Sequence, residues 1–184
     1  MSDIGERILK HVREMGVENM WEDRKIPNCV STLHGLLPAT KENYPPNSYV
    51  GKGSRRGSCD VVFDGNWIEV KFAWTYKDIE PYSSPNPSYK KHLLGDVESA
   101  LRDVQVKLAS LAGNPDVKRV ALLLVCLYSP SRPISIDTLE ELGGLRADGW
   151  VRSDLPPWPN PRNAGCSICA YLWERANPMV IPAP

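Results

Sequence analysis

A β-hairpin is predicted by the stretch Cys59-Asp60-Val61-Val62-Phe63-Asp64-Gly65-Asn66-Trp67-Ile68-Glu69-Val70-Lys71-Phe72. The dipeptide Asp64-Gly65 separates two apolar runs, and both residue types accept the positive φ angle that a type I′ turn requires. A two-residue loop pairs the last residue of the first strand with the first residue of the second. This register carries Asp60 to the position opposite Glu69.

Alternation along the two strands gives the hairpin one apolar face and one mixed face, because successive side chains point to opposite sides of a sheet. The apolar face is predicted to carry Val61, Phe63, Ile68, Val70 and Phe72. The mixed face is predicted to carry Asp60, Glu69 and Lys71 beside Val62 and Trp67. A slip of one residue would drive the charges into the core, so the register is well determined.

The facing carboxylates of Asp60 and Glu69 are expected to repel each other. At a separation of about 5 Å and an effective dielectric constant of about 20, the repulsion is on the order of 3 kcal/mol. It is relieved if one acid keeps its proton or if a cation lies between the two. Hard oxygen ligands suit Mg²⁺ or Mn²⁺ better than zinc. The plainer alternative is that these charges are only solvated on the outer face of a hairpin.

Asp60, followed by Glu69-Val70-Lys71, resembles the D…(D/E)-x-K motif of the PD-(D/E)XK nuclease superfamily. That superfamily includes restriction endonucleases, Holliday-junction resolvases and repair exonucleases. Its motif spans a hairpin that is preceded by a helix and followed by a helix and another strand. The residue before the aspartate is often proline there, whereas here it is Cys59.

The resemblance implies an α/β fold with a mixed central sheet flanked by helices, built on a restriction endonuclease-like αβββαβ core. It covers about residues 3–129 of the 184. We therefore expect a single nuclease-like domain, in which residues 130–184 form a C-terminal extension with a proline-rich loop and a last strand. A chain of this length is large enough to bury a core.

The resemblance also implies a metal-dependent nuclease that hydrolyses phosphodiester bonds, in DNA rather than RNA. Asp60 and Glu69 would bind Mg²⁺ or Mn²⁺, and the backbone carbonyl of Val70 would be a further ligand. Lys71 would orient or help deprotonate the attacking water and stabilise the charge that develops on phosphorus. The sequence does not separate a base from an electrostatic stabiliser at this position.

Members of the family commonly add a glutamate from the first helix. Three residues of the predicted first helix and its end qualify, and all lie off its apolar stripe: Glu6, Glu14 and Glu18. We favour Glu6 because it lies in the first turn. A solvated helix face is an equally good explanation for each of them.

Nucleic-acid contacts are predicted for basic residues near the hairpin, because the chain as a whole carries 22 basic and 22 acidic residues and has no global positive field. The candidates are Lys52, Arg55, Arg56, Lys90 and Lys91, with Gln105 from the second helix. Asp103 and Lys107 of that helix were weighed beside Gln105, and for each a solvated helix face is the simpler explanation. A homodimer is possible in a nuclease that acts on two strands.

Helical and strand periodicities predict the remaining elements. A first helix begins with Asp3 as its N-cap and ends at Gly16, and a second runs over Leu93–Leu111. Strands are predicted over Lys25–Leu33, Arg119–Leu127 and Ser167–Arg175, and a short helix over Ile136–Leu142. Loops are predicted over Pro38–Ser58, Lys77–Lys91 and Pro156–Pro161.

Five cysteines, no signal peptide and no apolar run long enough to span a bilayer predict a cytoplasmic protein without membrane contact. The pair Cys166 and Cys169 suggests a zinc or redox module, which is a third functional hypothesis. It lacks a second pair of ligands, and the three histidines show no metal spacing. The second hypothesis is a non-catalytic nucleic-acid-binding or assembly domain on the same fold.

Overall fold

A six-stranded mixed sheet organises the protein in the computed structural model, which describes residues 2–14, 27–44, 57–74, 101, 106–128, 136–143, 145–146, 149–160 and 163–177. The strand order is β1-β2-β3-β4-β6-β5, and only the β3–β4 pair is parallel within this sheet. The strands are β1 (Thr40–Asn43), β2 (Ser58–Phe63), β3 (Asn66–Trp74), β4 (Arg119–Tyr128), β5 (Val151–Asn160) and β6 (Asn163–Ala176). The predicted α/β class with a mixed sheet is confirmed.

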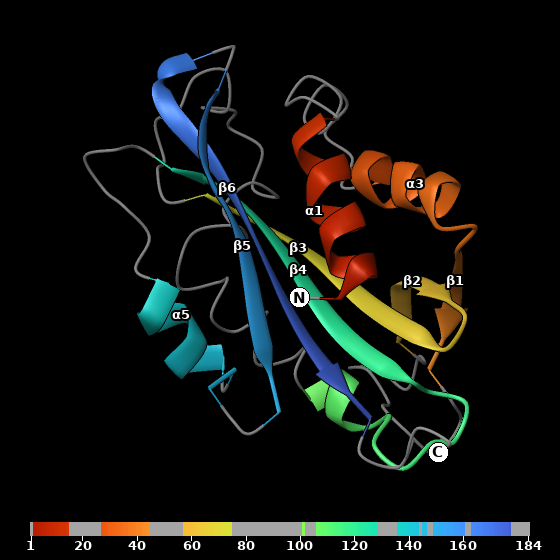
Figure 1. Ribbon diagram of the computed structural model, residues 1–184. Coiled ribbons are helices and arrows are strands. Elements are labelled where there is room, and N and C mark those ends of the chain that lie inside the picture. The colour runs from red at the N-terminus through yellow and green to blue at the C-terminus, as the bar shows by residue number, and fades with distance from the viewer. Residues whose placement is uncertain are drawn as a thin grey trace.

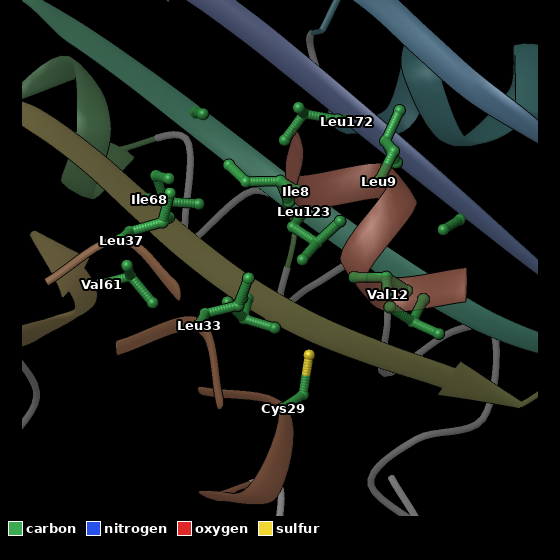
Figure 2. Close-up of a cluster of buried hydrophobic side chains, with 14 of the residues drawn as sticks. Ile8, Leu9, Val12, Cys29, Leu33, Leu37, Val61, Ile68, Leu123 and Leu172 are labelled. Atoms are coloured by element: carbon green, nitrogen blue, oxygen red, sulfur yellow. The ribbon is translucent and has the colours of Figure 1, made fainter. Parts of the chain in front are cut away.

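Helices lie on both faces of this sheet (Figure 1). α1 (Asp3–Glu14) and α3 (Pro27–Leu36) pack on one face, and their apolar residues form what we call the first core. Figure 2 shows this core, where Ile8, Leu9 and Val12 of α1 meet Leu33 and strand residues such as Leu123. On the other face, helical residues 101 and 106–109 cover the second core, which is built around Trp67, Leu108, Leu122 and Trp173.

The predicted hairpin is confirmed in its turn and in the register of the three residue pairs next to the turn, but the pairing ends before Asp60 and Glu69. Phe63 pairs with Asn66, and Val61 pairs with Ile68. Asp64 and Gly65 have φ angles of 41° and 73°, as a type I′ turn requires. The carbonyl oxygen of Gly65 accepts the backbone N–H of Lys118 at 2.8 Å, so the turn is also fixed to the chain that enters β4.

β4 confirms the prediction of a strand covered on both faces. Residues 120–126 are all buried, and alternate side chains enter the first and second cores. Two other predictions are also confirmed in the described residues, namely the short helix α5 (Ile136–Gly143) and the last strand β6. Leu101, Leu108 and Leu111, from the stretch predicted as the second helix, are buried.

The strand predicted over Lys25–Leu33 is wrong, because Pro27–Leu36 forms α3. Pro27 is the first residue of α3, and proline is well suited to the first position of a helix, where its missing N–H is not needed. Cys29, Leu33 and Leu37 recur every four residues and are buried in the first core. The N-cap of α1 is likewise Ser2 rather than Asp3, since the Ser2 hydroxyl accepts the N–H of Gly5 at 3.0 Å.

Two of the predicted loops contain strands. Thr40–Asn43, inside the loop predicted over Pro38–Ser58, forms β1 at one edge of the sheet, and its four residues are all exposed. Pro156, Pro157 and Pro159, inside the loop predicted over Pro156–Pro161, lie in β5 at the opposite edge, and Pro161 lies outside the described residues. The pairing of β5 with β6 shifts register between Leu155 and Trp158. Edge position and a bulge are the two settings in which a strand accommodates proline. The loop predicted over Lys77–Lys91 lies outside the described residues.

We predict that Gly65→Ala destabilises the protein by about 2 kcal/mol, because alanine is strained at positive φ. A Cβ atom there would also lie 2.8 Å from the backbone oxygen of Asp116. Gly35→Ala is the matched control, since nothing lies within 4 Å of its Cβ position inside α3. It should stabilise by about 0.5 kcal/mol. Urea denaturation measures both changes, and an equal effect of the two would contradict this account of the turn.

Candidate functional site

The carboxylate of Glu69 is buried in the middle of β3 and is the centre of the candidate site. Ile68 and Val70 on either side enter the first core, so the Glu69 side chain lies on the opposite face, where its exposed fraction is 1%. Its Oε1 accepts a hydrogen bond from the Tyr44 hydroxyl at 2.7 Å. The Lys107 Nζ lies 3.6 Å from Oε1, and the Lys71 Nζ lies 3.5 Å from Oε2.

This face of the hairpin is not the solvated outer surface that the alternation suggested. Val62 and Trp67 are buried on it beneath Leu101 and Leu108. Lys71 and Lys107 keep 28% and 19% of their side chains exposed, so they connect the buried carboxylate to solvent. The alternative of a merely solvated Glu69 is therefore wrong, since an ionised carboxylate at this depth needs compensating partners.

Asp60 lies where the regular pairing of β2 ends. Between the partners Thr40 and Glu42 of β1, β2 advances from Val62 to Cys59, which is one residue more. Such a bulge breaks the alternation of side chains. Cys59 accordingly enters the second core together with Val62, whereas strict alternation would separate them. The sequence carries no local signal for this bulge, and we did not predict it.

Two contacts hold Asp60 at the bulge. Its Oδ2 accepts the backbone N–H of Val70 at 3.0 Å, so a side chain takes the place of a ladder bond between β2 and β3. Its backbone carbonyl accepts a hydrogen bond from His34 Nε2 of α3 at 2.8 Å. The carboxylate of Asp60 therefore lies between the strands at the edge of Val70, instead of standing upright on the face beside Glu69.

The ionisation of Glu69 shows how the charges of the site act on one another. Burial raises the pKa of the Glu69 carboxyl, Lys71 lowers it, and Asp60 raises it further. The predicted arrangement, with the two carboxylates directly opposite each other on one face, is not observed, because the pairing of β2 with β3 ends at Val61–Ile68 and Asp60 binds the backbone of Val70 instead. Burial also raises the pKa of Tyr44, which keeps its hydroxyl protonated and able to donate.

The donor set of the site fits a hard divalent cation that retains water. Asp60 and Glu69 supply carboxylate oxygens, and the Val70 carbonyl points to the same strand edge as its N–H, which is the edge bonded to Asp60. Among the described residues there is no group of three or more histidine, cysteine, aspartate or glutamate side chains that could hold a metal by themselves. Mg²⁺ is commonly bound through only one or two protein carboxylates together with water and substrate oxygens.

The glutamate predicted from the first helix does not lie beside Asp60 and Glu69. Glu6 is exposed on α1, which packs against the first core on the face of the sheet opposite to the Glu69 side chain. Glu14 is also exposed and pairs with Lys10 within the same helix. Glu18 lies outside the described residues. So do all the predicted nucleic-acid contacts, namely Lys52, Arg55, Arg56, Lys90, Lys91 and Gln105.

Three residues of the site were not among the predicted ones. For Lys107 the sequence favoured a solvated helix face, whereas the structure places its ammonium beside Glu69. Tyr44 and His34 reach the site only through the pairing of β1 and the packing of α3. Neither carries a sequence signal beyond its residue type.

The cysteine pair gains no support as a zinc or redox module. Cys169 is buried and lies directly opposite Cys126 across β4 and β6, so its thiol faces the second core. Hydrogen bonding with Cys126 lowers the pKa of the Cys169 thiol, while burial opposes this effect. The side chain of Cys166 lies outside the described residues.

In the described part of the chain, no helix has the length and apolar character needed to cross a membrane. Comparisons with models of protein families, with curated proteins and with solved structures gave no match to this chain.

We predict that Glu69 makes the stability of the metal-free protein depend on pH. Because burial raises its pKa in the folded state, the folded protein holds the proton more tightly than the unfolded chain does. The resulting stabilisation is complete below the unfolded pKa of about 4.3 and is lost as pH rises through the folded value. In Glu69→Gln this loss should be absent, so the free energy of unfolding of the variant should rise relative to wild type as pH increases from about 4.3 through the folded pKa.

Denaturant unfolding at several pH values, in the presence of a chelator, measures this difference. Glu141→Gln on the exposed surface of α5 is the matched control and should follow the wild-type profile. Parallel profiles for wild type and Glu69→Gln would contradict the burial of an ionisable group at this position.

Proposed function

We propose that the protein is a metal-dependent nuclease of the PD-(D/E)XK type, which hydrolyses phosphodiester bonds in DNA. The observation that carries the proposal is the buried Glu69 carboxylate, which has the Lys71 ammonium 3.5 Å away. Asp60 is held at the neighbouring residue, where its Oδ2 accepts the backbone N–H of Val70.

The order of the elements also supports the proposal. A helix precedes the hairpin β2–β3, and helical residues 101 and 106–109 follow it before the parallel strand β4. This is the order in which the superfamily places its motif. The irregular edge at Asp60 supports it as well, because bulges are frequent beside active sites.

Asp60, Glu69 and the Val70 carbonyl would hold Mg²⁺ or Mn²⁺. When bound, the cation would lower the pKa of a coordinated water and neutralise charge on the phosphate oxygens. The chain's own contribution is to fix the acids. A backbone N–H holds Asp60, and a phenol with two ammonium groups holds Glu69. Groups held in place in this way need little rearrangement during the reaction.

Lys71 and Lys107 supply positive charge at the partly exposed side of the site. Each ammonium lies beside one oxygen of Glu69 at a distance beyond a short hydrogen bond. An anionic phosphodiester at this side of the site would attract both ammonium groups, which would then stabilise the charge that develops on phosphorus. This role extends the predicted function of Lys71 to a second lysine.

We predict that the purified protein cuts plasmid or linear duplex DNA with Mg²⁺ or Mn²⁺, and that Asp60→Asn and Lys71→Met each lower the rate by about 100-fold or more. Asp60→Asn removes a ligand charge, and Lys71→Met removes the ammonium while keeping most of the side-chain volume. Gel analysis of the products over time measures the rates, with single-stranded RNA as a parallel substrate.

The exposed ion pair of Asp64 and Lys118 offers matched controls. Asp64→Asn and Lys118→Met change the same residue types, but at the exposed hairpin turn instead of at Asp60 and Lys71. Both variants should leave the cleavage rate unchanged. Retention of DNA without any cleavage would support the binding or assembly domain instead. Cleavage that survives both Asp60→Asn and Lys71→Met would exclude this site as its source.

A further inference from the structure

We propose that Tyr44 is a positioning residue of the metal site, whose hydroxyl fixes the Glu69 carboxylate so that Oε2 is presented to the cation. The inference rests on the proposed function and deepens it. It assigns a role in the site to the residue that follows β1, whereas the resemblance implied a further site residue from the first helix.

The ring of Tyr44 is held in place from two sides. Its backbone N–H donates to the carbonyl of Gly57 at 3.0 Å, which continues the pairing of β1 with the chain entering β2. Its ring contacts that of Trp67, with centroids 5.5 Å apart and planes tilted by 40°. The exposed fraction of Tyr44 is only 1%, so its hydroxyl is enclosed beside Glu69 and does not face solvent.

The position of Tyr44 directly after β1 also explains the structural role of this strand. The four residues of β1 are polar and exposed, and the strand buries none of its own side chains. The first buried residue after it is Tyr44, which enters the second core beside Trp67. The strand thus acts as a support that carries one aromatic side chain under β3.

The two oxygens of Glu69 differ in how firmly they are engaged. Oε1 accepts the Tyr44 hydroxyl at 2.7 Å and has Lys107 at 3.6 Å. Oε2 has Lys71 at 3.5 Å, a long contact from a side chain that is partly exposed. A short hydrogen bond to one oxygen and a weak one to the other orients the carboxylate plane and leaves Oε2 as the oxygen for a ligand to use.

Tyr44→Phe tests the proposal, because it removes the hydroxyl and keeps the ring against Trp67. Titration calorimetry with Mn²⁺ should show affinity reduced by about 10-fold, as is usual when the partner of a metal ligand is removed. In the DNA cleavage assay, the Mn²⁺ concentration for half-maximal rate should rise by a similar factor. The rate at saturating Mn²⁺ should stay within about 2-fold of wild type, since Lys71 and both acids remain.

Tyr171→Phe is the matched control. Tyr171 lies on β6, two strands away from β3, with its ring against Trp173. It should bind Mn²⁺ and cleave DNA as wild type does. Thermal unfolding of the metal-free variants identifies any general loss of structure, which would lower the saturated rate of Tyr44→Phe as well as its affinity.

The outcomes separate this inference from the proposed function. Wild-type affinity for Mn²⁺ in Tyr44→Phe, in a protein that binds the ion and cuts DNA, would overturn the inference alone. A reduced saturated rate with unchanged affinity would overturn it too, because the hydroxyl would then act on the chemical step. If wild type neither binds Mn²⁺ nor cleaves nucleic acid, the proposed function fails and the inference with it.

Discussion

The burial of one carboxylate constrains the rest of this structure. Glu69 lies in the middle of a central strand with 1% of its surface exposed, and an ion at that depth must be compensated by nearby donors and charges. The donors come from three separate segments, since Tyr44 follows β1, Lys71 lies on β3 and Lys107 lies on the helix over the second core. The candidate site therefore forms only when these segments pack together in the second core.

The fold follows from the sequence where local chemistry and burial agree. Asp64-Gly65 determines the turn and hence the register, and the valine- and leucine-rich run of β4 determines a strand buried on both faces. Prediction failed at the prolines. The residue type excludes a central strand, but it does not distinguish a helix start at Pro27 from an edge strand at Pro156, because that difference depends on what packs alongside.

The residues of the candidate site likewise fall into two groups, those that local sequence predicts and those that depend on tertiary packing. Glu69 and Lys71 lie two residues apart on β3, so their spacing was enough to predict that they meet, whereas Asp60 lies on the same hairpin but binds the backbone of Val70 instead of facing Glu69. Tyr44 and His34 depend on sheet pairing and helix packing, which no local pattern encodes. The bulge at Asp60 is also a tertiary property, since it arises from the match between β2 and the short polar strand β1.

Charge balance connects the buried carboxylate to the proposed function. The carboxylates of Asp60 and Glu69 are matched by the ammonium groups of Lys71 and Lys107, so the cluster has no large net charge in the absence of a ligand. A divalent cation bound between the acids would leave an excess of positive charge, and the two lysines would lose their attraction to Glu69. A phosphodiester brings negative charge to the same place. Cation and substrate would thus each favour the binding of the other, which a purely structural salt-bridge cluster has no reason to do.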